Sequence, residues 1–279
     1  MSTFYNSERL KYNQMNYNND VELDNFCSQC LLVINAVGPS FKINDKIALH
    51  ALRNNCHYID IGGYGILRDL LKPYEKSIEA QKLCFIIGVG WMPGISGVFS
   101  KTIIETHLNS PENTNFNIYY GAVDNWSYSS TYDLAASSMG KTRSYVYSHG
   151  KEIQVSPFRY THHKFFPFIG HKKICMPSFD EQLTQLATSL KQIRKISTFI
   201  MLNDYISMGK FMFIKIFYKH NLNKATLMLQ DDYQRLVKKE NKWGSVICQV
   251  SKIEPERKID TFYYCLLYTS DAADDLIGV

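Results

Sequence analysis

The clearest pattern in the chain is a series of short apolar runs that each stop at glycine or proline. Three of them lie in the first hundred residues, at Leu31–Val37, His57–Ile61 and Leu83–Val89. Runs of this length that are rich in Val and Ile are typical of strands buried on both faces of a parallel sheet. Apolar residues repeat at helical spacing over Ile43–Leu52. The pattern therefore predicts a strand-helix-strand crossover.

Other helices are predicted around these strands. A short one is expected at Val21–Ser28, and a longer one at Ile66–Gln81, where Pro73 sits in the first turn or interrupts it. The next helix, Ile95–Leu108, begins just after Gly94. Residues 1–108 are therefore predicted to form a Rossmann-like domain.

Beyond residue 109 the pattern changes. The predicted elements are strands at Phe116–Val123, Thr142–Ser148 and Glu152–Pro157, an amphipathic helix at Phe179–Ile196, more helix within Phe199–Lys239, and a final strand at Trp243–Val250. A hairpin turn at residues 149–151 joins the second and third strands. The expected fold class is α/β: an incomplete Rossmann-type parallel sheet, followed by an α+β domain with a mostly antiparallel sheet at residues 109–264.

Composition narrows the possible partners. The 279 residues include 31 basic and 26 acidic side chains, which are dispersed, so no nucleic-acid partner is expected. The polar, Asn-rich start argues against a signal peptide. No apolar run approaches the ~20 residues of a membrane span, and residues 211–218 are broken by Lys215, so no membrane partner is expected. Seven cysteines in a chain of this length favour a reducing, cytoplasmic compartment.

The two ends of the chain carry their own predictions. No strand followed by G-x-G-x-x-G and a helix is present, so the Rossmann unit is predicted to be a fragment that lacks its front. The segment CLLYTSDAADDL resembles translated sequencing-adapter sequence. Residues 265–279 are therefore predicted to be a non-native tail.

Three motifs, VINAVGPS, HYIDIGG and GVGWMPGIS, resemble the nucleotide-binding domain of the saccharopine dehydrogenase-like oxidoreductases. In that family a strand ends in Asn-Ala-x-Gly-Pro, a Tyr-x-Asp strand follows, and a third strand leads to Gly-x-x-Pro-Gly. The resemblance covers roughly Leu31–Ile104. The chain departs from it at Gly63 and Tyr64 and at Met92, where the family often has acidic residues.

The resemblance implies that the protein is an NAD(P)-dependent oxidoreductase in its full-length form. NAD or NADP would be the cofactor, with hydride transfer to or from a small amino- or keto-acid-like or imine substrate, and the protein could form a homodimer. The alternative is a non-catalytic nucleotide-binding or scaffold protein that retains the fold. Met92 and Tyr64 in place of acidic residues favour this alternative slightly.

The candidate cofactor site lies where the parallel strands end, because ligands of such sheets bind at the carboxyl ends of the strands. The predicted cofactor-binding residues are Asn35, Ala36, Val37, Gly38, Pro39, Asp60, Gly62, Gly90, Pro93, Gly94 and Ser96. Asp60 either hydrogen-bonds a ribose or substrate, or caps a loop. Ser96 and Gly94 either form an anion site at a helix N-terminus or only shape the start of that helix. No catalytic acid or base is identified; the candidates by position alone are Asp60, Tyr64, Asp124 and Tyr132.

Several other patterns are weaker. The Cys27–Cys30 pair and the loosely spaced His162, His163 and His171 lack the further ligands of a metal site, so no metal is expected and the histidines are predicted in a polar loop. Gly140, Lys141 and Thr142 precede a predicted strand rather than a helix, which excludes a P-loop. An aromatic-rich patch is interpreted either as a substrate cleft or as sheet packing; it comprises Tyr119, Tyr120, Trp126, Tyr128 and Tyr132.

Overall fold

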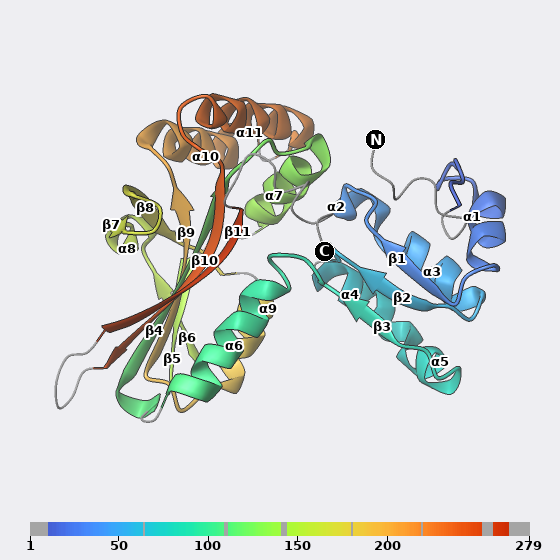
Figure 1. Cartoon of the computed structure of the whole chain (residues 1–279), viewed down its shortest axis with the longest axis horizontal. Helices are drawn as coiled ribbons and strands as arrows, with labels where there is room; N and C mark the ends of the chain where they lie inside the picture. The colour runs from blue at the N-terminus through green and yellow to red at the C-terminus, as the bar shows by residue number, and fades with distance from the viewer. Residues whose placement is uncertain are drawn as a thin grey trace.

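The computed structural model describes residues 11–63, 65–108, 111–140, 144–179, 181–218, 220–252 and 259–267. It confirms the predicted α/β class. A three-stranded parallel sheet lies on one side of the molecule and a larger mixed sheet on the other (Figure 1). The predictions for Tyr64, for Lys141 and Thr142, and for residues 268–279 fall outside the described residues.

The small sheet contains the three predicted strands. They are β1 (Leu32–Asn35), β2 (His57–Asp60) and β3 (Phe85–Ile87), in the order β1-β2-β3. The register aligns Asn35 with Asp60 and Asp60 with Ile87. Because the strands are parallel, the turns that follow them meet at one edge of the sheet.

One face of the small sheet is covered by helices. α1 (Asp20–Cys27), α3 (Lys46–Arg53) and α4 (Gly65–Leu71) pack their apolar residues on Val33 and Tyr58. The Asn19 side chain starts α1 by accepting the backbone N–H groups of Val21 and Glu22. The opposite face exposes apolar side chains, namely Leu32 (41%), Ile34 (61%) and Ile86 (47%).

Shorter helices connect these elements. α2 (Ser40–Ile43) precedes α3, and the predicted helix at Ile66–Gln81 is divided into α4, a 3₁₀ turn (Lys72–Tyr74) and α5 (Glu75–Ala80). The division falls at Pro73, whose ring cannot continue the hydrogen-bond ladder. α6 (Ile95–His107) then leads into the second sheet.

The larger sheet has eight strands and is mostly antiparallel, as predicted. Its main path runs β11-β10-β4-β9-β5-β6, and only the β4–β9 pair is parallel in the described part of the chain. The strands are β4 (Thr114–Val123), β5 (Ser144–Ser148), β6 (Lys151–Val155), β7 (His162–Phe166), β8 (His171–Pro177), β9 (Lys195–Leu202), β10 (Trp243–Lys252) and β11 (Ile259–Leu267). β8 pairs with both β7 and β9.

Alternate residues of β4 face two different cores. Phe116, Ile118 and Tyr120 pack against α6 and α9 (Glu181–Ser189). Tyr119 and Val123 face the opposite way, toward the β7–β8 hairpin and α11 (Leu222–Val237). The remaining helices are α7 (Tyr128–Gly140), α8 (Pro157–Tyr160) and α10 (Tyr205–Phe217).

Several sequence predictions for the second half were wrong. The helix predicted at Phe179–Ile196 ends at Ser189, and residues 195–202 form the central strand β9, because a short apolar run does not distinguish a buried strand from a helix. The strand predicted to end at Pro157 ends at Val155. α7, β7 and β8 were not predicted, and β11 follows the supposed final strand.

β11 also extends into the segment interpreted as a tail, since its last three residues are 265–267 and Leu267 pairs with Gly244. Within the described residues, the structure contains no helix with the length and apolar character needed to cross a membrane.

Candidate functional site

The turn after β1 is held by the last residue of that strand. Asn35 is buried, and its Nδ2 donates to Asp60 Oδ2 at 2.7 Å and to the Tyr58 hydroxyl at 3.0 Å. Its Oδ1 accepts the backbone N–H of Val37 at 3.0 Å. This side chain therefore ties the turn to the adjacent strand β2, which explains why a buried polar residue stands at the end of β1.

The carboxylate at the end of β2, that of Asp60, is hydrogen-bonded to other residues of the protein. Asp60 is 3% exposed and accepts from Asn35 and from the Tyr58 hydroxyl. Burial, and then the adjacent Asp60, raise the pKa of Tyr58 above its ordinary value, so this phenol remains a donor. This geometry favours a structural role for Asp60 over a hydrogen bond to a ribose or substrate.

The glycines of the turns are explained first by contacts between turns. A Cβ at Gly62 would lie 2.0 Å from Ser40 Oγ, and one at Gly90 would lie 2.6 Å from the Ile61 carbonyl oxygen. At Gly38 a Cβ would lie 2.8 Å from the Cβ of Ser129 on α7. The three turns and α7 therefore pack closely enough to exclude side chains at these positions.

The start of α6 is occupied by a side chain from the second half of the chain. Gln182 Oε1 on α9 accepts the Gly94 backbone N–H at 2.9 Å and the Ser96 hydroxyl at 3.3 Å. Ser96 is fully buried. Gln182 therefore takes the hydrogen bonds that an anion would take at this helix N-terminus, which favours the interpretation that Gly94 and Ser96 shape the start of the helix.

A cavity of about 1080 Å³ lies between the turns of the small sheet and the second sheet. Among the predicted site residues, seven line it: Asn35, Ala36, Val37, Gly38, Gly62, Gly90 and Pro93. Pro39, Asp60, Gly94 and Ser96 do not line it. The structure thus brings the turns after β1, β2 and β3 to one cavity, as expected from the shared edge of the parallel strands. Their role in cofactor binding stays a prediction.

The opposite wall comes from the second half of the chain. Tyr120 and Trp126 of the aromatic-rich patch line the cavity, whereas Tyr119 stacks on Phe199 on the other face of the sheet. Tyr132 lies beneath Lys42, whose Nζ is 4.4 Å from its ring centroid. The aromatic patch is therefore divided between cavity wall and packing.

Sequence analysis did not identify the hydroxyl-rich part of this wall. The residues are Ser127, Ser129, Ser130, Ser137 and Ser138, on and just before α7. The available signal was a helix-length segment of small residues, SSTYDLAASS, after a strand. Small side chains on α7 leave the space that forms the cavity.

The carboxylates on the cavity wall all have internal partners. Asp124 Oδ1 is 3.1 Å from Lys242 Nζ, and Glu181 pairs with Arg68. Asp133 accepts the backbone N–H groups of Ser40 and Phe41, at 2.9 and 3.2 Å. Burial raises the pKa of Asp133, although these two N–H groups act in the opposite direction. No Lys, Arg or His lines the described part of the cavity.

The remaining sequence patterns have structural explanations. Within the described residues, no group of three potential ligands could hold a metal ion. Cys27 is buried and Cys56 Sγ donates to the carbonyl oxygens of Cys27 and Cys30, so these thiols pack together. The prediction of a polar loop for His162, His163 and His171 was wrong, since they lie in β7 and β8.

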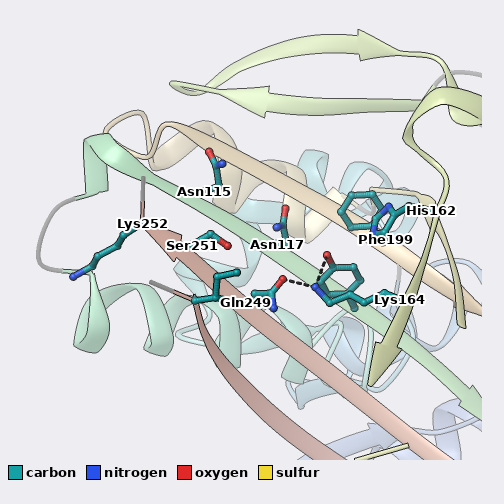
Figure 2. Close-up of a pocket in the computed structure, with 10 residues that line it drawn as sticks. Asn115, Asn117, His162, Lys164, Phe199, Gln249, Ser251 and Lys252 are labelled. Atoms are coloured by element: carbon teal, nitrogen blue, oxygen red, sulfur yellow. Dashed lines mark hydrogen bonds between the residues drawn. The ribbon is translucent and has the colours of Figure 1, made fainter. Parts of the chain in front are cut away.

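A second cavity, of about 640 Å³, lies over the outer face of β4 and β10 (Figure 2). Lys164 Nζ projects into it and donates to Gln249 Oε1 and to the Tyr119 hydroxyl. Burial lowers the pKa of Lys164. Two of the three N–H groups of Lys164 are thus used in hydrogen bonds within the protein.

A scan against protein-family models finds no matching family, and a search of the curated proteins finds no match. Among solved structures, the fold is similar to apo saccharopine dehydrogenase (L-Glu forming) from Saccharomyces cerevisiae, with a TM-score of 0.58 and 15% sequence identity. The match covers 93% of this chain and 77% of that one. At this identity the likeness establishes the fold alone: the chain has a fold similar to that of saccharopine dehydrogenase.

Proposed function

We propose that the protein is an NAD(P)-dependent oxidoreductase of the saccharopine dehydrogenase-like type. The observation that carries the proposal is the position of the large cavity, which opens at the carboxyl ends of three parallel strands and against a second sheet. Cofactors of doubly wound sheets bind at this edge. The distant structural match and the three sequence motifs point the same way.

The residues present suit the nicotinamide and ribose end of the cofactor. The turn Asn35–Gly38 and residues Gly62 and Gly90 form a narrow, glycine-lined wall, and Trp91, Met92 and Pro93 supply an apolar surface. The chain has no G-x-G-x-x-G turn for the pyrophosphate, so the proposed contacts concern the other end. When bound, the nicotinamide would exchange the hydride, while these residues orient it.

The substrate would lie against α7, β4 and the segment around Trp126. Within the proposed range of amino- or keto-acid-like and imine substrates, this wall favours an uncharged carbonyl or imine. The reason is that it presents serine hydroxyls and aromatic rings, with no Lys, Arg or His in its described part. Trp91 also lines this cavity, and its indole Nε1 is a buried donor with no hydrogen-bond partner among the described residues.

A non-catalytic binding protein is the second candidate. One observation favours it: the wall carboxylates Asp124, Asp133 and Glu181 all have internal partners. A general acid or base must reach the proton that it transfers. Binding of nicotinamide nucleotide without turnover of keto acids or imines would support this alternative.

The test is a fluorescence titration of the purified chain with NADPH and NADH. Ala36 is an exposed residue that lines the cavity, so Ala36→Trp should weaken binding at least tenfold by occupying the nucleotide end. Ala80→Trp, at the exposed end of α5, is the matched control and should leave binding unchanged. Absence of binding by the unaltered chain, or equal binding by both variants, would reject the proposed cofactor site.

A further inference from the structure

The second cavity lies on the face of β4 that points away from the proposed cofactor site. Asn115, Asn117 and Tyr119 of β4 line it, whereas Tyr120 and Ala122 line the large cavity. Successive side chains of a strand point to opposite faces of the sheet, so the sheet itself separates the two cavities. The volume of the second cavity, about 640 Å³, lies within the range of ~300–1,000 Å³ that is usual for ligand pockets.

The floor of the second cavity is polar, although the same face of the sheet is apolar nearby. Tyr119 belongs to the core beneath the β7–β8 hairpin and α11. Two positions before it, on the same face, lies Asn117, which the register pairs with Gln249 of β10. Two positions earlier still, Asn115 is paired with Ser251. This face therefore changes from aromatic to amide and hydroxyl side chains within two pairs of residues.

Three of these polar side chains are available to a ligand. Within the described residues, the side chains of Asn115, Asn117 and Ser251 have no hydrogen-bond partner. Oδ1 of Asn115 is buried, so the group that Asn115 can offer is its amide Nδ2. The Asn117 amide and the Ser251 hydroxyl can each donate and accept.

Lys164 is held in one position at the end of the cavity nearest Gln249. Its Nζ donates to Gln249 Oε1 and to the Tyr119 hydroxyl, and it lies 4.7 Å from the centroid of the Tyr119 ring (Figure 2). One of its three N–H groups is left for a ligand. Because the side chain is already ordered, binding would cost less conformational entropy than it would at a mobile surface lysine.

The charged groups of the cavity favour an anion. Lys164, Lys252 and His162 line its described part, and no Asp or Glu does. Lys164 forms no ion pair with any described residue, and burial lowers its pKa because the ammonium is poorly solvated there. A half-buried ammonium without a carboxylate beside it is stabilised when an anion binds to it.

The polar floor shows what else the ligand must carry. Asn115 and Asn117 lie about 7 Å apart along β4, since a strand advances ~3.3–3.4 Å per residue. A single phosphate or carboxylate bound to Lys164 is too small to reach along this row, whereas a chain of six carbons with hydroxyl groups is long enough. We propose that the second cavity binds a sugar-sized polyol that carries one anionic group, phosphate or carboxylate, at the Lys164 end.

The experiment is isothermal titration calorimetry of the full chain with glucose 6-phosphate, gluconate, glucose and inorganic phosphate. Glucose 6-phosphate or gluconate should bind at least tenfold more tightly than glucose, which lacks the anionic group, and than inorganic phosphate, which lacks the polyol. The tighter of the two identifies the anionic group as phosphate or carboxylate. No binding of either, or equal affinity for glucose or inorganic phosphate, would overturn the proposal.

Two variants locate the binding to this cavity. Lys164→Met removes the ammonium and keeps an unbranched side chain, so it should weaken binding of the tighter anion at least tenfold. Asn117→Asp keeps the size of the side chain and should weaken binding as much, because its carboxylate repels the anion. Lys76→Met, at an exposed lysine of α5, is the matched control and should leave binding unchanged.

Circular dichroism melting verifies that each variant is folded. Equal affinity in Lys76→Met and in either cavity variant would overturn the proposal. The inference is independent of the proposed oxidoreductase activity, because the two cavities lie on opposite faces of β4. Lys164→Met should therefore leave the NADPH titration unchanged.

Discussion

Replacing Asn35 tests whether the candidate cavity depends on one buried hydrogen-bond network. Asn35→Ala removes the Nδ2 hydrogen bonds to Asp60 and Tyr58 and the Oδ1 acceptor of the Val37 N–H. The bond to the Asp60 carboxylate is worth ~1.5–3 kcal/mol and each of the other two ~0.5–1.5 kcal/mol. We therefore expect the free energy of unfolding to fall by about 3–5 kcal/mol.

The assay is urea unfolding followed by circular dichroism, at constant pH and protein concentration. Tyr58→Phe removes the hydroxyl donor to Asp60 and should cost about 1.5–3 kcal/mol. The cost in unfolding free energy of the double variant should differ from the sum of the two single costs by on the order of 1 kcal/mol, because Asn35 and Tyr58 both donate to the Asp60 carboxylate. Asn113→Ala, at an exposed asparagine in a 3₁₀ turn, is the control and should change stability by under ~0.5 kcal/mol.

The same variants separate stability from ligand binding. Asn35→Ala should also weaken NADPH binding, because the turn that lines the cavity loses its anchor. A cost below ~1 kcal/mol for Asn35→Ala would show that water or a shifted backbone replaces these bonds, and the argument that Asn35 organises the site would be refuted.

Three further predictions follow from other contacts. Gly38→Ala should destabilise the protein by ~1–3 kcal/mol in thermal melts, because the added Cβ would lie 2.8 Å from Ser129 Cβ. Adding Ser129→Gly should restore most of the lost stability, and failure to restore it would contradict this contact. Ile34→Thr, on the exposed face of the small sheet, should raise solubility in ammonium sulfate precipitation with little change in melting temperature. Unchanged solubility would contradict the expectation that this exposed apolar face limits solubility. Burial raises the pKa of Asp204, but the hydrogen bonds from Arg235 and Ser207 and the Arg235 charge together outweigh burial and hold the pKa at about 2, below the ordinary 3.8. The Asp204 contribution is therefore full above about pH 4 and lost as pH falls toward 2, so Asp204→Asn should lower the melting temperature at neutral pH and converge with the unaltered chain near pH 2.

The sequence by itself determined the small sheet and the edge where its turns meet. Apolar runs that stop at Asn35, Asp60 and Gly88 are local signals, because a buried strand must be apolar and a sharp turn needs residues that tolerate it. The helices that connect these strands were also predicted, with Pro73 as a point of interruption, because helical periodicity and proline are local sequence signals. This half of the chain was therefore predicted nearly in full.

The second sheet was harder because its strands are defined by their neighbours. The run KISTFIML was predicted to continue a helical region, yet it is β9, paired with β4 in parallel and with β8 in antiparallel. Nothing within the run distinguishes a buried strand from a buried helix. β7 and β8 carry the histidines that suggested a polar loop, and only the pairing of β7 with β8 and of β8 with β9 makes them strands.

The roles of the site residues were decided by contacts between distant segments. Gln182 reaches the start of α6 and takes the hydrogen bonds of Gly94 and Ser96, across 88 and 86 positions of the chain. Asp133 reaches the start of α2 from 93 positions away. A sequence motif shows which groups a turn offers, but packing determines whether a ligand or another part of the chain occupies them.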